Sequence, residues 1–246
     1  MSSFEGKVAL VTGGSRGIGA ATVHRLASQS AAVGFTWRSG EEAARAVERE
    51  APGARGWQAD VRDPGAVERF VAEAEEAWGG IDVLVANAGI WKGAPIDAMT
   101  PEEWRETIEV NLGGTYALCR YGIPALRRRG GGAVVVVSST AGQRGEAGHS
   151  HYAASKGAQI AFVKSLAVEC GPAIRVNAVA PGWVDTEMSA GPLGGPDRAG
   201  IESAIPLGRV ATADDVAKAI VFLAGPTARH ITGEVLNVNG GSVLCG

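Results

Sequence analysis

The chain has 246 residues, of which 46% are hydrophobic and 20% charged, enough apolar material to bury the core of one of the larger α/β domains. Its formal net charge of −3 leaves no basic excess for a phosphate backbone, so we expect no nucleic-acid partner. The three cysteines, Cys119, Cys170 and Cys245, lie far apart and form no CxxC pair, so we expect packing thiols, a reducing compartment and no bound metal.

The first residues, 1–7, lead directly into a strand pattern and lack the charged-then-apolar layout of a signal peptide. The apolar runs elsewhere in the chain are too short to span a bilayer. We therefore expect a soluble, cytoplasmic protein with no membrane partner.

Short apolar, β-branched runs alternate with amphipathic stretches along the chain. They predict strands at residues 8–11, 31–37, 56–61, 81–86, 133–138, 174–178 and 235–238. Helical patterns lie at 18–28, 41–50, 64–78, 101–129, 152–170 and 212–224. This alternation predicts a single α/β domain over residues 1–246, with a Rossmann-like, doubly wound parallel seven-stranded sheet and helices on both faces.

Residues 187–206, between the sixth strand and the last helix, are rich in Gly and Pro and have no clear place in the sheet. We predict that this segment is a flexible flap over a substrate site, the alternative being a plain surface loop. Its sizeable apolar residues are Leu193, Ile201 and Ile205.

A glycine-rich turn, Thr12-Gly13-Gly14-Ser15-Arg16-Gly17-Ile18-Gly19, joins the first strand to the first helix. Glycines in such a turn let the backbone approach a ligand and direct a helix N-terminus at a pyrophosphate. The G-x-x-x-G-x-G spacing differs from the G-x-G-x-x-G pattern of classical dinucleotide folds. Its place between strand and helix still predicts a dinucleotide site, with contacts from Gly13, Ser15, Arg16, Gly17, Ile18 and Gly19.

The end of the second strand indicates which dinucleotide binds. An NAD site needs an acid there to accept hydrogen bonds from the ribose, about twenty residues after the glycines. The chain instead has Trp37-Arg38-Ser39, and Arg38, aided by Arg16, can pair with a 2′-phosphate. We expect NADPH or NADP+ as the cofactor, the alternative being that both arginines are solvated surface charges.

Further motifs follow along the chain: Asp60-Val61, Asn87-Ala88-Gly89, Asn111, Ser139, Tyr152 with Lys156, and Pro181-Gly182 with Thr186. In their order and spacing, the chain resembles the classical short-chain dehydrogenase/reductase family, and most closely its 3-oxoacyl-carrier-protein reductase branch. The resemblance implies a catalytic tetrad of Asn111, Ser139, Tyr152 and Lys156. It implies cofactor contacts at Trp37, Arg38, Ser39, Asp60, Val61, Asn87, Ala88, Gly89, Tyr152, Lys156, Pro181, Gly182, Val184 and Thr186.

The spacing of Tyr152 and Lys156 also supports this chemistry from the residues themselves. At positions i and i+4 they share one helical face and can reach one ligand. A phenol has a pKa of about 10, and a neighbouring ammonium and an oxidised nicotinamide favour the phenolate, so Lys156 would tune Tyr152 as the proton donor to a carbonyl oxygen. Ser139, which ends the fifth strand, would donate a hydrogen bond to that oxygen.

Asn111 falls inside a helical pattern, a poor place for Asn unless it distorts the helix to hold a water. The resemblance implies that such a water links Lys156 to solvent. Taken singly, Asn111 and Asn87 could also be local backbone bonders.

Candidate substrate contacts lie between the fifth strand and Tyr152. Gln143 and Arg144 are expected to line a substrate pocket, or else to be solvated. His149 and His151 are expected in the pocket wall or at the surface, with His149 as a candidate substrate contact and neither as a metal ligand.

The resemblance implies an NADPH-dependent carbonyl reductase acting on a 3-oxoacyl thioester held by an acyl carrier protein. An acidic carrier would dock on a basic face, for which the three arginines 127–129 are candidates, although they also suit the end of their helix. Where carrier-protein reductases often have a basic residue before the sixth strand, this chain has Cys170-Gly171-Pro172-Ala173, which weakens the case for a carrier.

Two other functions are open from the sequence. One is a reductase or dehydrogenase of a free ketone, sugar or specialised metabolite. The other is a non-catalytic NADP(H)-sensing regulator, against which the intact Tyr152 and Lys156 argue. The resemblance also implies a homotetramer that pairs through the long helices and the last strand.

Overall fold

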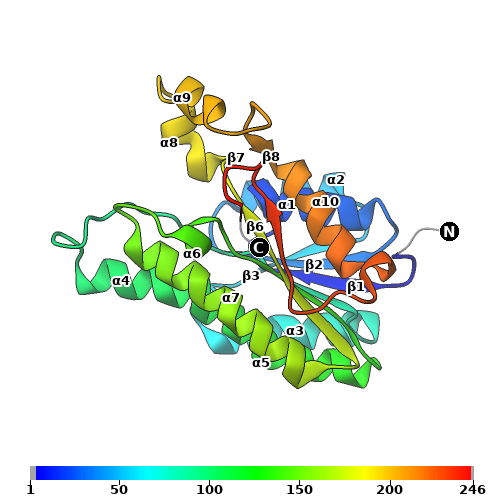
Figure 1. Cartoon of the computed structure of the whole chain (residues 1–246). Coiled ribbons are helices and arrows are strands. Elements are labelled where there is room, and N and C mark those ends of the chain that lie inside the picture. Colours follow the sequence, from blue (N-terminus) through cyan, green and yellow to red (C-terminus); the bar gives the residue numbers. More distant parts are fainter. Residues whose placement is uncertain (1–3, 245–246) are drawn as a thin grey trace.

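The computed structural model describes residues 4–244 as one α/β domain built on a seven-stranded parallel sheet (Figure 1). The strand order is β3–β2–β1–β4–β5–β6–β9. The strands are β1 (Val8–Val11), β2 (Ala32–Trp37), β3 (Ala54–Gln58), β4 (Val83–Ala86), β5 (Gly132–Val137), β6 (Ile174–Pro181) and β9 (Val235–Val238). The predicted fold class is confirmed.

The third strand differs most from its prediction, since it lies at 54–58 rather than at 56–61. The chain leaves the sheet because a turn forms in which the backbone N–H of Asp63 donates to the carbonyl of Asp60 at 3.0 Å. Asp63 then caps the next helix by accepting from the backbone N–H of Gly65 at 2.9 Å.

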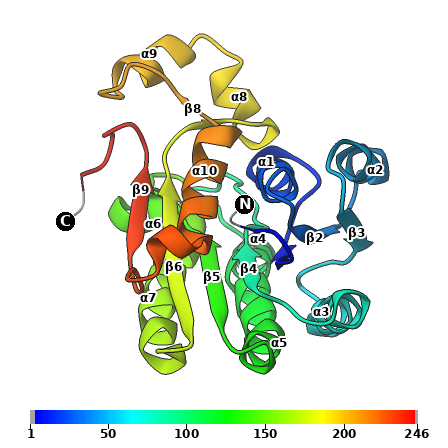
Figure 2. The same cartoon turned by 90° about the vertical axis from the view of Figure 1, so that its right-hand side faces the viewer.

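Helices cover both faces of the sheet (Figure 2). On one face lie α3 (Pro64–Trp78), α5 (Gly114–Arg128) and α7 (Ser150–Cys170), and on the other α1 (Gly17–Ala27), α2 (Glu41–Glu50) and α10 (Ala213–Ala224). Successive strand residues point to opposite faces, so Leu10 and Leu84 join one core cluster while Val11 and Val85 join the other. A sheet buried on both faces explains the uninterrupted apolar strands.

The strand order reverses beside β1, which lies between β2 and β4. In open parallel sheets, ligands bind in the crevice outside the carboxyl ends of the strands at this reversal. The glycine-rich turn leaves the carboxyl end of β1, so the topology places it in that crevice.

The segment 187–206 contains short helices rather than a plain loop. These are a 3₁₀ turn (Glu187–Ser189), α8 (Ala190–Leu193) and α9 (Arg198–Ser203). A two-stranded ribbon of β7 (Val184–Asp185) and β8 (Ala211–Thr212) fastens its two ends, and the segment stands apart from the main sheet at the top of Figure 1. Its flexibility stays a prediction.

Within residues 4–244, no helix is long and apolar enough to cross a membrane. The same residues contain no cluster of His, Cys, Asp or Glu that could hold a metal ion. Cys119 and Cys170 are free and buried, whereas Cys245 lies outside the described residues.

Candidate active site

A cavity of about 880 Å³ lies at the carboxyl ends of the strands. All the residues that the sequence indicated as cofactor contacts line it, from Gly13 in the first turn to Thr186 at the start of the flap. Ser139, Tyr152 and Lys156 line it as well, so one cavity joins the expected dinucleotide site to the expected catalytic groups.

The glycine-rich turn is tied to the neighbouring strand through Asn87. Its side-chain amide donates to the carbonyl oxygens of Thr12 and Gly13 at 2.9 and 3.0 Å. Gly13 has φ +69°, and a Cβ on Gly19 would lie 2.0 Å from the Gly13 carbonyl oxygen. No larger residue fits at position 19, so the close turn that brings the backbone to a ligand depends on glycine.

The N-terminus of α1 faces this cavity, and no acidic side chain of its first turn competes with a ligand for the backbone N–H groups there. The first turn of α1 contains no acidic residue, and Arg16 at the N-cap makes no side-chain cap hydrogen bond. A helix start of this kind binds phosphate oxygens through free backbone N–H groups and the helix dipole.

At the end of β2, the aromatic side chain and the cation that follows it lie in different environments. Trp37 is 7% exposed and packs in the core, whereas Arg38 is exposed on the cavity wall. The nearby Asp60 accepts from the Arg62 guanidinium at 2.5 Å, and this hydrogen bond holds the pKa of the Asp60 carboxyl below its usual range. The charge of Asp60 is therefore already paired with Arg62. Arg38 itself has no ion-pair partner within residues 4–244.

Arg16 points to the flap rather than to Arg38. Its guanidinium lies 3.8 Å from the carboxylate of Glu187, and both side chains are well exposed. Both arginines expected at the 2′-phosphate line the cavity, but Arg16 lies near an acid of the flap whereas Arg38 does not.

The catalytic candidates meet above the carboxyl end of β5. Burial raises the pKa of Tyr152 to about 12, the Ser139 hydroxyl lowers it in part, and the charge of Glu146 raises it. Burial lowers the pKa of Lys156 to about 7, and its Nζ donates to the Val137 carbonyl at 2.8 Å. The Lys156 Nζ also lies 5.7 Å from the centre of the Tyr152 ring. Contrary to the expectation that Lys156 would favour the phenolate, burial therefore keeps the phenol protonated at neutral pH, while the amine beside it can gain or lose a proton.

The helix that carries Asn111 is distorted at that residue. Between α4 (Pro101–Ile108) and α5, residues Glu109–Gly113 form a π-helical turn. The Asn111 side chain accepts from the Ile90 N–H at 2.8 Å and donates to the Ser155 hydroxyl at 3.0 Å. Asn111 does not line the cavity; it lies behind Lys156.

Gly89 marks the point where Asn111 and Lys156 approach each other. A Cβ there would lie 3.2 Å from the Asn111 Oδ1 and 3.5 Å from the Lys156 Nζ. The main-chain carbonyl of Asn111 accepts hydrogen bonds from Thr115 and from the buried Gln159, both at 2.8 Å. Gln159 was not identified from the sequence. A glutamine on the apolar face of the helical pattern at 152–170 could have suggested it, because a buried Gln needs hydrogen-bond partners.

The three substrate candidates separate in the structure. Arg144 lines the cavity, but Gln143 donates to Asn237 at 2.7 Å and lies outside the lining. His149 also lies outside the lining and stacks behind Trp91, with ring centres 4.6 Å apart. His151 is fully buried, rather than in the pocket wall or at the surface, because its helix turns it toward the core.

Trp91, Glu146 and Trp183 line the cavity, and sequence reasoning missed them. Each follows the carboxyl end of a central strand, namely β4, β5 or β6. That position was the available signal, because ligand contacts in this type of sheet come from the loops after the strands.

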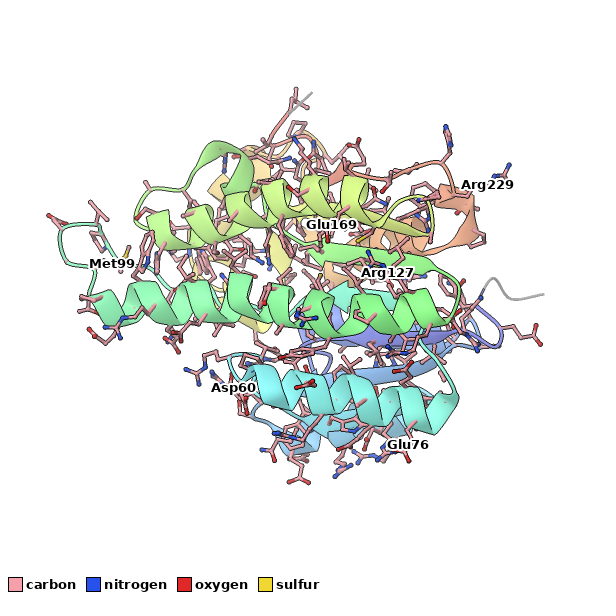
Figure 3. All side chains as sticks on the ribbon, turned by 90° about the horizontal axis from the view of Figure 1, so that it is seen from below. Asp60, Glu76, Met99, Arg127, Glu169 and Arg229 are labelled. Carbon is pink, nitrogen blue, oxygen red and sulfur yellow. The ribbon has the colours of Figure 1, made fainter. Side chains whose placement is uncertain are left out.

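Two arginines of the basic triplet 127–129 form ion pairs with acids of the same domain. Arg128 donates to Glu75 at 2.6 Å, and the Arg129 guanidinium lies 3.5 Å from Asp82. Arg127 and Glu169 lie on α5 and α7 of the same face (Figure 3). Two of the three charges are therefore neutralised by neighbouring acids.

Comparisons with known proteins agree with this geometry. A family model described as enoyl-(acyl carrier protein) reductase matches residues 13–242. The chain is 39% identical over 243 residues to the 3-oxoacyl-[acyl-carrier-protein] reductase FabG of Escherichia coli strain K12, a match covering 98% of this chain and 99% of the relative. It is 43% identical over 245 residues to the short-chain reductase protein NovJ of Streptomyces niveus, covering 95% and 93%.

A solved structure from Brucella melitensis, described as a short-chain dehydrogenase/reductase and glucose/ribitol dehydrogenase, has a TM-score of 0.94 to this fold. It is 32% identical and covers 99% of both chains. The matched relatives share a reductase or dehydrogenase description while their substrate descriptions differ. This chain is an oxidoreductase that acts on carbonyl or hydroxyl groups, and it belongs to the short-chain dehydrogenase/reductase family.

Proposed function

We propose that this chain reduces the keto group of a 3-oxoacyl thioester to a hydroxyl group and uses NADPH as the reductant. The observation that carries this proposal is the meeting of Ser139, Tyr152 and Lys156 in the cavity that the glycine-rich turn enters. The 3-oxoacyl part rests on the E. coli relative, whose description states that substrate.

The residues of the first turn fit a dinucleotide. The close approach required at Gly19 and the uncapped start of α1 together form a cradle for a pyrophosphate. When bound, the reduced nicotinamide supplies the hydride for the carbonyl carbon.

Tyr152 supplies the proton. Because its pKa is about 12, the phenol is protonated at neutral pH and can donate to the carbonyl oxygen as negative charge develops there. Ser139 donates a hydrogen bond to the same oxygen. Lys156, with a pKa of about 7, then returns a proton toward Tyr152, and Asn111 holds the helix and loop around Lys156 in place.

Arg38 is the residue that selects NADPH. It is exposed on the cavity wall, follows the end of β2 directly, and has no carboxylate held against it within the described part of the chain. A guanidinium in this position can bond two oxygens of a 2′-phosphate. Arg16 also lines the cavity, where Glu187 competes for its charge.

We further propose a homotetramer in the cytoplasm that accepts its substrate from an acyl carrier protein. Tyr116 on α5 and Val168 on α7 are 52% and 85% exposed, which supports pairing through the long helices. Arg128 and Arg129 pair with acids, whereas Arg127, which is exposed and lies beside Cys170, has no carboxylate within 4.0 Å among residues 4–244 and is the cation of the triplet that we assign to a carrier.

Steady-state turnover of NADPH with an N-acetylcysteamine 3-oxoacyl thioester, the same acyl group on a carrier protein, and a panel of free ketones and sugars tests this function. We expect turnover with the thioester and a lower KM with the carrier. Turnover only with free ketones or sugars would assign the chain to another carbonyl substrate. NADPH binding without turnover of any carbonyl would indicate a sensing regulator.

A further inference from the structure

Two indole rings form a corner on the wall of the cavity. The centres of the Trp91 and Trp183 rings lie 5.7 Å apart at an interplanar angle of 89°. Both residues line the same cavity as Tyr152. The cavity that contains Tyr152 therefore also presents two perpendicular aromatic surfaces.

A carboxylate completes this corner. The Trp91 indole N–H points at Glu146, with 3.2 and 3.3 Å to its two oxygens. Glu146 also lines the cavity, and its charge is close enough to Tyr152 to raise the pKa of the phenol. The carboxylate therefore belongs to the same cavity as the proton donor.

The charge of Glu146 has no Lys or Arg partner within 4.0 Å among residues 4–244. Its one ion-pair neighbour is His149, whose Nδ1 lies 3.7 Å away. Arg144 lies in the same lining and makes no such pair with Glu146. Of the ion-paired carboxylates among the described residues, only Glu146 and the well-exposed Glu50, which lies near His24, have a histidine rather than an Arg or a Lys as the partner.

Other side chains pack against both rings of the corner. His149 stacks on Trp91 with an interplanar angle of 8° and ring centres 4.6 Å apart. Trp183 packs with Leu193, Ile205 and Val210 at the base of the flap. Each indole therefore has a packing partner of its own within the fold.

We propose that the natural substrate carries a positively charged amino or ammonium group near its keto group, bound by Glu146, Trp91 and Trp183. This proposal rests on the proposed function and names the class of acyl group that the site takes. A cation uses every feature of the corner, because indole faces attract cations and the carboxylate pairs with them. An alkyl chain or an aromatic ring would use the indoles but would leave the charge of Glu146, which no Lys or Arg of residues 4–244 pairs with, without a ligand cation.

The test compares three N-acetylcysteamine 3-oxoacyl thioesters that differ only in the acyl terminus. One ends in a trimethylammonium group, one in the isosteric tert-butyl group and one in a phenyl group. The measured quantity is kcat/KM with NADPH for each thioester. We expect the trimethylammonium thioester to exceed the tert-butyl one by about tenfold or more, because a cation–π contact and an ion pair both depend on its charge.

The variant Glu146→Gln keeps an acceptor for the Trp91 N–H and removes the charge. It should bring the ratio of trimethylammonium to tert-butyl thioester close to one. Because both thioesters meet the same Tyr152, any change in that phenol cancels in the ratio. Trp91→Phe should lower the ratio partly, since a phenyl face binds cations less well than an indole face.

The matched control is Asp197→Asn, which removes one negative charge from the flap side of the same cavity. It should leave the ratio as in the wild type. A wild-type ratio near one, a preference for the phenyl thioester, or an unchanged ratio in Glu146→Gln would overturn the proposal. Equal turnover of all three thioesters would do so while leaving the proposed function intact, whereas no turnover of any thioester would count against the proposed function itself.

Discussion

The cofactor half and the substrate half of the cavity are built in different ways. The cofactor half consists mostly of backbone: a glycine turn held by Asn87, the start of α1, and strand ends of the sheet. The substrate half consists of side chains from loops and the flap, among them Trp91, Glu146 and Trp183. The first half is constrained by the sheet, whereas the second can change its side chains without altering the fold.

The largest expected effect lies where the two halves meet. Tyr152→Phe removes the transferable proton and little volume, so we expect turnover to fall by about a hundredfold or more, because general acid catalysis typically contributes that much. The dissociation constant of NADPH, measured by fluorescence titration, should change little. A Tyr152→Phe enzyme that kept more than about a tenth of wild-type turnover would show that another group is the acid.

Arg38→Ala tests the cofactor half alone. A charge-assisted hydrogen bond contributes roughly 1.5 to 3 kcal/mol, so kcat/KM for NADPH should fall about ten- to a hundredfold while the value for NADH stays nearly unchanged. The KM for the carbonyl substrate at saturating cofactor should not move. Arg16→Ala should lower kcat/KM for NADPH less, because Glu187 already neutralises part of the charge of Arg16. An Arg38→Ala enzyme with the wild-type preference would contradict the assignment.

The structure also corrects a design that the sequence suggests. Replacing Trp37 by Asp would place an acid at the usual NAD position, but the Trp37 side chain is 7% exposed and packs in the core. A carboxylate there would lose a large apolar contact and its own hydration. We therefore expect Trp37→Asp to lower the melting temperature strongly rather than to invert cofactor preference cleanly, as thermal unfolding with and without NADH would show.

Trp183→Ala tests the substrate half alone. The variant removes one side of the indole corner and loosens its packing with Leu193 and Ile205, so the KM for the carbonyl should rise by about tenfold. The dissociation constant of NADPH should stay within about twofold of the wild-type value. A matched loss of NADPH affinity would show that the two halves are not separate.

The last expected effect is on stability rather than on turnover and concerns Lys156. Its pKa is about 7 in the folded chain, below the ordinary value of 10.5, so the unfolded state binds more protons between these two values. The free energy of unfolding of the wild type should therefore rise with pH across this range, relative to a Lys156→Met variant without the titrating group. Urea unfolding at pH 7 and pH 9 measures the difference. Parallel pH dependence in both proteins would show that Lys156 titrates normally.

Prediction from the sequence was most successful where periodicity and capping act locally. The helices at 41–50 and 64–78 have the predicted bounds, and Thr100 and Thr212 cap their helices as capping boxes. The third strand shifted because a turn at Asp60 competes with the sheet. The π-helical turn at Asn111 depends on bonds to Ile90 and Ser155, which no local pattern reveals.

By itself, the sequence determined the fold class, the family resemblance and the residues that line the cofactor half. The glycine spacing, the alternation of strand and helix patterns, and the i, i+4 spacing of Tyr152 and Lys156 can all be read along the chain. Only the tertiary structure decided which side chains meet across loops. It placed Arg16 beside Glu187, buried Trp37, moved Gln143 and His149 out of the cavity lining, and brought Trp91, Glu146 and Trp183 together. The physical reason is that such contacts join loops from different strands, and their geometry depends on how the whole sheet places the ends of those strands.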